Sequence, residues 1–248
     1  MKLISLNVWC GIKYPKLMAF LERQSLDTDI FCLQEVRNGS YPAGISIPGE
    51  RENLFEEIGR VLIDFTGYFT PVAVGVGIAM FVRRGIKAAK VESREILSSI
   101  ELEHIRMENG NRYYARFLQS AYLEEAGVIV HNFHGLPGMG KKDTPERKIQ
   151  TDRLLSILDG AGKSQIIVGD FNLAMDTEAV ARLSYGLKNL VREGNFKTTR
   201  NRYYDKWETS PFADYAFVSS GIGINHFSVL PDEVSDHLPL SLDFSVTK

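Results

Sequence analysis

The chain has 248 residues, of which 44% are hydrophobic and 24% are charged, and its formal net charge is −2. A chain of this size and composition can bury a substantial core, which excludes an intrinsically disordered protein. The slight acidic excess excludes the overall positive field that dedicated nucleic-acid-binding domains carry. No internal repeat or low-complexity linker divides the sequence, which therefore predicts a single domain over residues 1–248.

Apolar runs of strand length recur along the chain. They cover residues 2–9, 29–36, 74–83, 113–123, 127–133, 165–171, 213–219, 224–230 and 238–246. Helical periodicity appears between them, at residues 16–25, 51–65 and 144–160, and another helix is expected to start at Asp176 or Thr177. The order does not alternate strictly between strand and helix, and from about residue 213 it consists of strands alone. This order predicts two packed sheets with helices outside, not a doubly wound parallel sheet.

The cysteines and the N-terminal segment indicate the cellular compartment in which the protein is expected. Cys10 and Cys32 belong to no CxxC or Cys/His cluster, which is typical of a reduced chain. No cleavable signal follows the first residues, and no apolar stretch reaches the roughly 20 residues of a membrane span. We therefore expect a cytoplasmic protein without a membrane span, whose oligomeric state is left open.

Short polar groups stand at the ends of several apolar runs. They are Asn7, Gln34-Glu35, Asn132 with His134, Asp170 with Asn172, and Asp236-His237. An acidic residue at the end of a buried strand is costly unless it is paired or binds a cation. Because Mg²⁺ prefers carboxylate and carbonyl oxygens, Glu35 and the amide oxygen of Asn7 would form a sparse magnesium site.

The histidines in this set suit phosphoryl chemistry. A histidine near neutral pH can transfer a proton or stabilise negative charge on a phosphate. His237 would need an orienting partner in this role, and Asp214 is the candidate. His104 and His226 lack polar companions and are interpreted as structural or surface residues. A zinc site stays an alternative, although the sequence has neither HExxH spacing nor a CxxC pair.

Motifs for other hydrolytic mechanisms are missing from the sequence. It contains no GxSxG nucleophile elbow and no GxxxxGK[ST] phosphate loop. The simplest remaining mechanism is direct attack by water with the help of a metal ion.

In chain order, the segments LISLNVW, LQEV, NFHG, GDFNL and SDHLPL resemble the motif set of the endonuclease/exonuclease/phosphatase superfamily. The resemblance runs from about residue 3 to about residue 244. It implies a DNase I-like α/β fold, a four-layer sandwich of two mixed sheets packed face to face with helices outside. It also implies Mg²⁺-dependent hydrolysis of a phosphoester, with Mn²⁺ as a substitute ion.

The resemblance further implies roles for single positions on the metal and water side. Glu35 resembles the principal metal ligand of the family, Asn7 its amide companion, and Asp236 the carboxylate at the metal side. Asp170 resembles the carboxylate that orients or deprotonates the attacking water. Asn172 resembles the amide that holds the scissile phosphate.

Other positions resemble the groups that surround this phosphate. His237 resembles the histidine beside it, with Asp214 as the acid that orients the ring. His134 resembles a histidine that contacts phosphate in several branches. Arg147, with Gln150, resembles an Arg-x-x-Gln element of the following helix, and it is expected to support the site or bind substrate.

The substrate is left open among several phosphoesters. A phosphodiester of the nuclease type is the first prediction; a phosphomonoester and a phospholipid or sphingomyelin-type diester are alternatives, and a catalytically silent binding module is the non-enzyme alternative. Trp9, in place of the second Asn of an NxNG motif, and His134 argue against an abasic-site endonuclease. The basic and aromatic segment 197–207, which includes Arg200 as a candidate substrate-binding residue, could form one wall of a nucleic-acid groove. The loops at 38–50, 135–145 and 196–212 are expected to set specificity.

Overall fold

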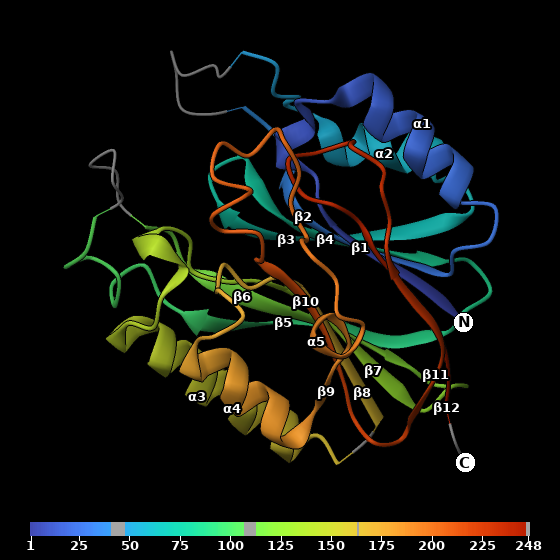
Figure 1. Ribbon diagram of the computed structural model, residues 1–248. Helices are drawn as coiled ribbons and strands as arrows, with labels where there is room; N and C mark the ends of the chain where they lie inside the picture. The colour runs from blue at the N-terminus through green and yellow to red at the C-terminus, as the bar shows by residue number, and fades with distance from the viewer. Residues whose placement is uncertain (41–47, 107–112, 163, 247–248) are drawn as a thin grey trace.

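The computed structural model describes residues 1–40, 48–106, 113–162 and 164–246 of the chain. These residues form two six-stranded sheets stacked face to face, with helices on both outer sides (Figure 1). The fold is therefore a four-layer α/β sandwich, which confirms the fold class. Residues 41–47 of the predicted specificity loop 38–50 lie outside the described residues.

The first sheet places the N-terminal strand at its centre. Only β1 and β2 are parallel; their neighbours are antiparallel. In spatial order its strands are β11 (Ile222–Val229), β12 (Leu240–Val246), β1 (Lys2–Asn7), β2 (Ile30–Arg37), β4 (Val76–Arg83) and β3 (Phe65–Ala73). The nearly continuous burial of β1 and β2 explains why their sequences are apolar runs instead of alternating ones.

The second sheet has the same plan, with a parallel pair inside an otherwise antiparallel sheet. The parallel pair is β7 and β8. In spatial order the strands are β5 (Ala88–Leu97), β6 (Arg116–Leu123), β7 (Val128–His134), β8 (Ser164–Asp170), β10 (Asp214–Val218) and β9 (Lys188–Asn189).

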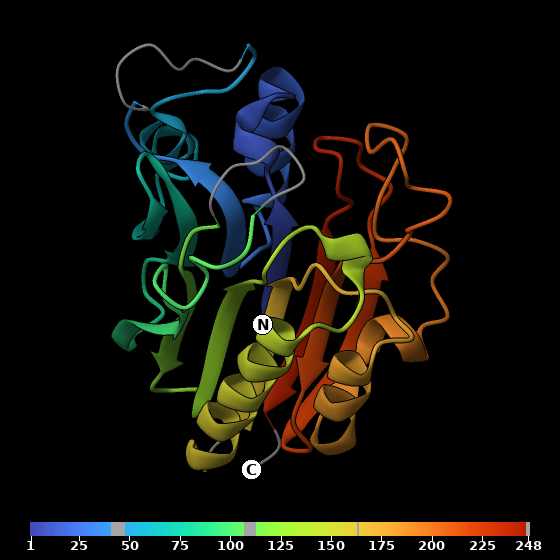
Figure 2. The ribbon, with the colours of Figure 1, turned by 90° about the vertical axis from the view of Figure 1, so that its left-hand side faces the viewer.

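Helices cover the two outer faces of the stack (Figures 1 and 2). On the first sheet lie α1 (Tyr14–Gln24) and α2 (Leu54–Val61), and on the second lie α3 (Pro145–Gly160) and α4 (Glu178–Gly186). Short segments complete the elements: η1 (Trp9–Gly11), η2 (Met139–Lys141) and α5 (Leu190–Glu193). Thr144 and Thr177 cap α3 and α4 through their side-chain oxygens, as threonine before a first turn commonly does. No helix in the described part of the chain is long and apolar enough to cross a membrane.

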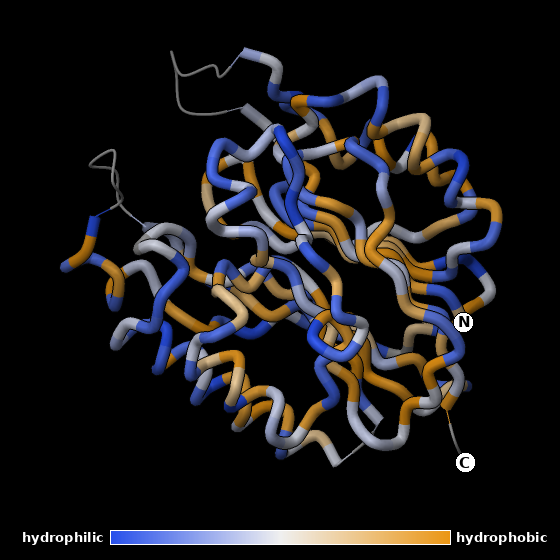
Figure 3. Tube along the Cα trace, viewed as in Figure 1, coloured by the Kyte–Doolittle hydropathy of each residue, from blue (hydrophilic) through white to orange (hydrophobic). Residues whose placement is uncertain are grey.

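The hydrophobic core has two parts. One lies between the sheets and under α3 and α4, and the other lies between the first sheet and α1 and α2. In the hydropathy view, hydrophobic residues concentrate along the strands, while the helices alternate between hydrophobic and hydrophilic positions (Figure 3). Phe171 stands at an aromatic junction, with ring centroids of Phe133, Tyr215 and Phe217 between 5.2 and 5.8 Å away.

Three strands, β3, β5 and the two-residue β9, were not expected from the sequence. The helix expected at 51–65 is too long, because α2 ends at Val61 and Phe65 already begins β3. β3 and β5 are both edge strands of their sheets. An edge strand carries exposed polar side chains and turn-type residues, as the Gly67 and Pro71 of β3 illustrate, so its apolar signal is weak.

Candidate active site

The register of the second sheet brings three of the candidate residues onto one rung. In β7, His134 lies opposite Asp170 of β8, and in β10 Asp214 lies opposite the same Asp170. Paired residues of neighbouring strands point to the same face, so the pairing alone brings an imidazole and two carboxylates together. On the first sheet, Asn7 ends β1, and Glu35 follows its pairing partner Gln34 in β2.

The GDFN segment has the backbone that this arrangement requires. Gly169 has a φ of +143°, and a Cβ atom there would lie 1.9 Å from the carbonyl oxygen of Phe133. Any other residue would push β7 and β8 apart at this point. Asn172 has a φ of +55°, and its backbone N–H donates to Asp170 Oδ1 at 2.9 Å. The turn therefore aims both Asp170 and Asn172 into the site.

Two loops that are distant in the sequence complete the site. Arg200 and His237 form an isolated antiparallel bridge. The backbone N–H of Leu238 donates to Thr199 at 2.9 Å, and that of Asn201 to Asp236 at 3.2 Å. The two segments run side by side at one end of the sandwich (Figure 2). Their pairing carries Arg200, Asp236 and His237 over the strand ends.

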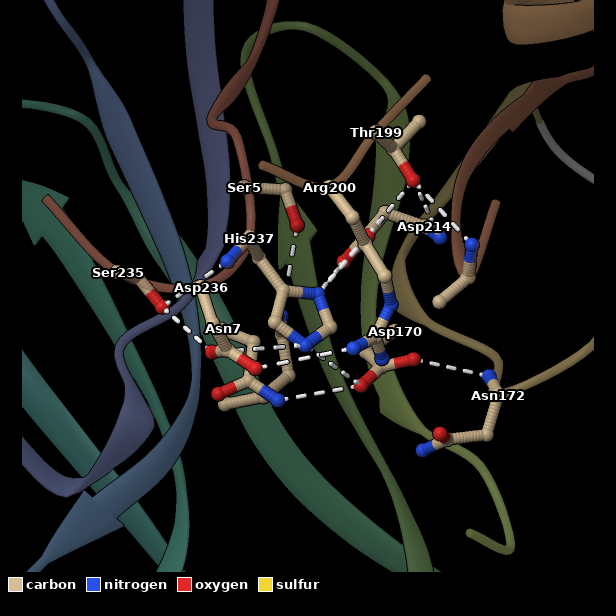
Figure 4. A network of polar contacts seen from close by, with 12 residues as sticks. Ser5, Asn7, Asp170, Asn172, Thr199, Arg200, Asp214, Ser235, Asp236 and His237 are labelled. Atoms are coloured by element: carbon tan, nitrogen blue, oxygen red, sulfur yellow. Dashed lines mark hydrogen bonds and ion pairs between the residues drawn. The ribbon is translucent and has the colours of Figure 1, made fainter. Parts of the chain in front are cut away.

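His237 is held in one orientation by a short chain of hydrogen bonds (Figure 4). Its Nδ1 lies 2.9 Å from Asp214 Oδ2, which also accepts a 2.9 Å hydrogen bond from the hydroxyl of Thr199. Its Nε2 points to Asp170, 3.6 Å from Oδ2. Burial and Arg200 lower the pKa of His237, but the carboxylates around the ring outweigh them, so the pKa is raised. The geometry thus favours a protonated imidazole whose Nε2–H faces the site.

Asp170 lies at the centre of the polar network. The side-chain amide of Asn7 donates to Asp170 Oδ2 at 3.1 Å. Burial would raise the pKa of Asp170, but His237, His134 and Lys141 hold the pKa below its ordinary range. The carboxylate is therefore ionised across the neutral pH range.

His134 behaves differently from His237. Burial lowers the pKa of His134 to about 3, so its ring is neutral at ordinary pH. Its Nε2 has no hydrogen-bond partner among the described residues, although Glu35 Oε1 lies 3.8 Å away and Asp170 Oδ2 lies 3.7 Å away. A buried ring nitrogen without a partner, between two carboxylates, is suited to a bound group that supplies the missing contact.

The residues expected to bind a metal ion lie beside this nitrogen. Glu35 has a strained φ of +54° at a bulge between β2 and β4. Burial, and then the nearby Asp236, raise the pKa of Glu35. Asp236 is 9% exposed and lies 3.7 Å from Arg200. Crowded carboxylates with an amide oxygen from Asn7 are a donor set that fits Mg²⁺ or Mn²⁺.

A second group of ligand-type atoms belongs to Asp170, Asp214 and His237, which lie within 4.8 Å of one another. These atoms are already engaged with each other, because His237 Nδ1 is bonded to Asp214. An ion placed among them would break that bond. The Glu35 side of the site fits a cation better.

Arg147 does not occupy the position expected of a substrate contact. Its side chain is fully buried, and its guanidinium donates to the carbonyl oxygens of Lys142, Leu136, Gly138 and Asn172 at 2.5 to 2.9 Å. These bonds tie the loop after β7 to the turn after β8. Arg147 therefore braces the walls of the site from behind, and only its expected supporting role agrees with this geometry.

Sequence reasoning missed one cation at the site. Lys141 is 5% exposed, and its ammonium donates to Asn172 Oδ1 at 3.3 Å. Burial lowers the pKa of Lys141 to about 8. The lysine stands in a polar loop with a Gly-Met-Gly segment before it, and nothing in that pattern distinguishes it from the exposed Lys142.

Two of the polar residues at strand ends, Gln34 and Asn132, stabilise the packing of the sheets and do not face the site. Gln34 donates to Asn132 Oδ1 at 2.7 Å, and Asn132 donates to the carbonyl oxygens of Leu33 and Ala79. Both side chains are fully buried between the sheets. They form a polar bridge from the first sheet to the second, which fixes how far apart the two halves of the site lie.

Two hollows open from the site on different sides. The Glu35 hollow, of about 240 Å³, is lined by Glu35, His134, Glu50 and Arg116 among others. The Lys141 hollow, of about 570 Å³, is lined by Lys141, Asn172, Arg200 and Tyr204 among others. Pro137 lines both, so the two hollows adjoin at the loop after β7, with His134 in the lining of one and Asn172 in that of the other.

The fold and the site together define a class of protein, a DNase I-like sandwich with acidic, amide and imidazole groups at the strand ends. The model of the Endonuclease/Exonuclease/phosphatase family matches residues 4–237. The chain therefore belongs to the endonuclease/exonuclease/phosphatase family. A comparison with curated proteins found no match.

Solved structures show the same fold at low sequence identity. An endonuclease/exonuclease/phosphatase from Bacteroides vulgatus is 13% identical, with a TM-score of 0.75 and coverage of 99% of this chain and 98% of that one. The Bacteroides thetaiotaomicron mannosyl-6-phosphatase Bt3783 is 16% identical, with a TM-score of 0.74 and coverage of 98% and 99%. The human Nocturnin catalytic domain with bound sulfate is 18% identical, with a TM-score of 0.66 and coverage of 100% and 93%. These likenesses show the fold alone.

Proposed function

We propose that this protein is a divalent-cation-dependent hydrolase of phosphodiesters that acts by in-line attack of water. The observation that carries the proposal is the continuous polar line from Thr199 through Asp214, His237 and Asp170 to Asn7, which ends beside Glu35. A proton-handling group and a cation-binding group thus face each other across one small space.

The donor set on the Glu35 side would hold the cation. Glu35 and Asp236 supply carboxylate oxygens, and Asn7 supplies an amide oxygen that also accepts the backbone N–H of Trp9 at 3.0 Å. Mg²⁺ or Mn²⁺ bound there would neutralise phosphate charge and stabilise the leaving oxygen.

The chain's own groups have distinct tasks in this proposal. Asp170 is ionised and buried, so it accepts the proton of the attacking water. His237 presents Nε2–H to a non-bridging oxygen while Asp214 holds the ring. Asn172 and the neutral His134 donate to the remaining phosphate oxygens. Asn172 is set for this by its own turn, and by the Lys141 ammonium on its amide oxygen.

Space on both sides of the reacting groups favours a diester over a monoester. A diester phosphate carries a substituent on each side, and the Glu35 and Lys141 hollows provide room for both. The similar solved structures include a mannosyl-6-phosphatase, Nocturnin and TDP2, so the shared fold does not identify the substrate, which the loops around the site select.

The test is hydrolysis of bis(p-nitrophenyl) phosphate and p-nitrophenyl phosphate with Mg²⁺, with Mn²⁺ and with EDTA. We expect cation-dependent turnover that is faster for the diester and that falls in Glu35→Gln at the cation concentration that saturates the wild type. The exposed Glu22 of α1 provides the control Glu22→Gln, which should match the wild type. Faster turnover of the monoester would show that the protein is a phosphomonoesterase and not a phosphodiesterase. Cation binding without turnover of either ester would instead indicate a silent scaffold.

A further inference from the structure

The Lys141 hollow differs from the rest of the site in its charge. Of its described lining residues, Lys141, Arg200 and Lys206 are cationic and none is a carboxylate. The Glu35 hollow, by contrast, has two carboxylates and one arginine in its lining. A concave surface whose charged residues are all cationic raises the local concentration of anions and disfavours cations.

Lys141 is buried in a way that its protein contacts do not explain. The residue is 5% exposed, yet among the described residues its ammonium has one hydrogen bond, to the neutral amide of Asn172, and one ring contact, 5.5 Å from the centroid of Tyr204. Within the described residues it forms no ion pair with a carboxylate at 4.0 Å or less. Burying an ammonium costs free energy unless an opposite charge compensates it. A bound anion in the hollow would provide that charge.

The backbone holds Lys141 in this costly position. Lys141 has a φ of +57°, which is unusual for a lysine. Its N–H donates to Gly138 and its carbonyl oxygen accepts from Ala174 at 2.9 Å. Arg147 ties the same loop through the carbonyl oxygens of Gly138 and Lys142. The backbone that carries Lys141 is therefore fixed by these hydrogen bonds, and Lys141 differs in this from a lysine on a free surface loop.

Arg200 supplies the second fixed cation. Its guanidinium lies over the ring of Tyr204 at 3.8 Å from the centroid, and its side chain is 5% exposed. One terminal nitrogen lies 3.7 Å from Asp236, and Nε has no partner among the described residues. Arg200 thus lies between Asp236, on the proposed metal-binding side of the site, and the Lys141 hollow.

We propose that the Lys141 hollow is a binding subsite for a second, non-reacting phosphate group of the substrate. The proposal rests on the function proposed above, since Asn172 would hold the reacting phosphate at the edge of the hollow. Lys141 and Arg200 bind the second phosphate, and the exposed Lys206 lies at the rim. The substrate is then a phosphodiester that carries a further phosphate nearby.

The test uses matched substrates that differ by one phosphate. They are thymidine 5′-(p-nitrophenyl phosphate) and the same ester with a 3′-phosphate, each assayed with saturating Mn²⁺. For the wild type we expect a higher kcat/KM with the 3′-phosphate. In Lys141→Met this preference should fall by about 10- to 100-fold, the usual range for a lost contact between charged groups. Lys141→Arg should restore part of it.

Lys142→Met is the matched control, because Lys142 is the exposed neighbour and does not line the hollow. Its preference between the two esters should equal that of the wild type. Equal kcat/KM values for both esters in the wild type, or an equal loss for both in Lys141→Met, would overturn the subsite. No cation-dependent turnover of either ester would instead contradict the proposed function itself.

A third substrate distinguishes the source of the second phosphate. A short single-stranded oligonucleotide offers the next phosphate of a polymer, whereas the 3′-phosphorylated ester offers that of a small molecule. A higher kcat/KM for the oligonucleotide, which falls steeply with salt in the wild type and less steeply in Lys141→Met, supports the subsite with a polymer substrate. A higher kcat/KM for the small ester supports it with a small bisphosphorylated substrate.

Discussion

The two sheets have the same plan but contribute differently to the site. Each has a parallel pair inside it, β1 with β2 and β7 with β8, and the site lies where the ends of these pairs meet. The first sheet supplies Glu35, with a strained backbone and a raised pKa. The second supplies Asp214, which lies 2.9 Å from His237 Nδ1, and Asp170, which lies 3.6 Å from His237 Nε2. Under the proposed function, one half is a crowded set of carboxylates that a cation would relieve, and the other is a proton-handling set whose groups already contact one another.

The largest expected effect tests the second half. His237→Gln keeps a polar side chain but removes the charged donor, and we expect turnover to fall by about 10³-fold. The affinity for Mn²⁺ should change little, because the ligands of the first half are untouched. Steady-state kinetics and a Mn²⁺ titration measure the two quantities. A large loss of Mn²⁺ affinity in this variant would show that the two halves do not have separate tasks.

The matching test of the first half is Glu35→Gln, which removes one carboxylate charge. We expect the apparent affinity for Mg²⁺ to fall by about 10- to 100-fold, with part of the turnover recovered at high Mg²⁺. Isothermal titration and activity against Mg²⁺ concentration measure this. An unchanged Mg²⁺ response would remove Glu35 from the proposed ligand set.

The loops that follow β7 and β8 in the second half should depend on Arg147. Arg147→Met leaves buried carbonyl oxygens without donors, and we expect the free energy of unfolding to fall by about 2–4 kcal/mol. Urea denaturation measures the loss, and Lys148→Met, exposed on the same helix, should leave the stability unchanged. A wild-type midpoint in Arg147→Met would contradict the bracing role.

The smallest expected effect concerns His131 on the outer side of the second sheet. Burial lowers the pKa of His131 to about 4, while Ser120 and Gln165 hold its ring nitrogens. Because the unfolded chain binds a proton below pH 6.5 and the folded chain does not, this histidine removes stability as the pH falls from 6.5 toward 4. Between pH 7 and pH 5.5, His131 is expected to lower the free energy of unfolding by about 1 kcal/mol.

The variant His131→Gln should therefore be less sensitive to acid than the wild type. Urea midpoints at the two pH values give the comparison. An equal acid loss in both proteins would show that other groups, such as the buried His134, account for it.

The fold class could be predicted because strand ends carry recognisable residues in a fixed order. The runs of β1, β2, β7 and β8 are apolar on both faces, so their signal is strong. The edge strands β3, β5 and β9 give no clear signal, because exposure on one side makes the first two polar and β9 has only two residues. The helix at 51–65 was extended too far, because Phe65 fits a helical face and a strand start equally well.

The candidate site was only partly predictable, because some of its residues carry no recognisable local sequence signal. Asp170, Asn172 and Glu35 stand in short motifs, and the structure brings them together with His134, Asp214 and His237. Thr199 and Lys141 stand in ordinary polar loops, and Arg147 has a sequence context that fits a surface cation as well as a brace. Their positions follow from contacts across long sequence separations, such as that of Arg147 with Asn172.

The sequence by itself determined which chemical groups are available, that they follow apolar strands, and the family to which the chain belongs. Only the tertiary structure decided which of them face one another, because strand register and loop pairing set distances of a few ångströms between residues far apart in the chain. It also decided that Gln34 and Asn132 bridge the sheets while Glu35 and His134 face the site. Asn132 and His134 are two residues apart and share one face of β7, so only the packed neighbour decides whether a position on that face meets the other sheet or the open site.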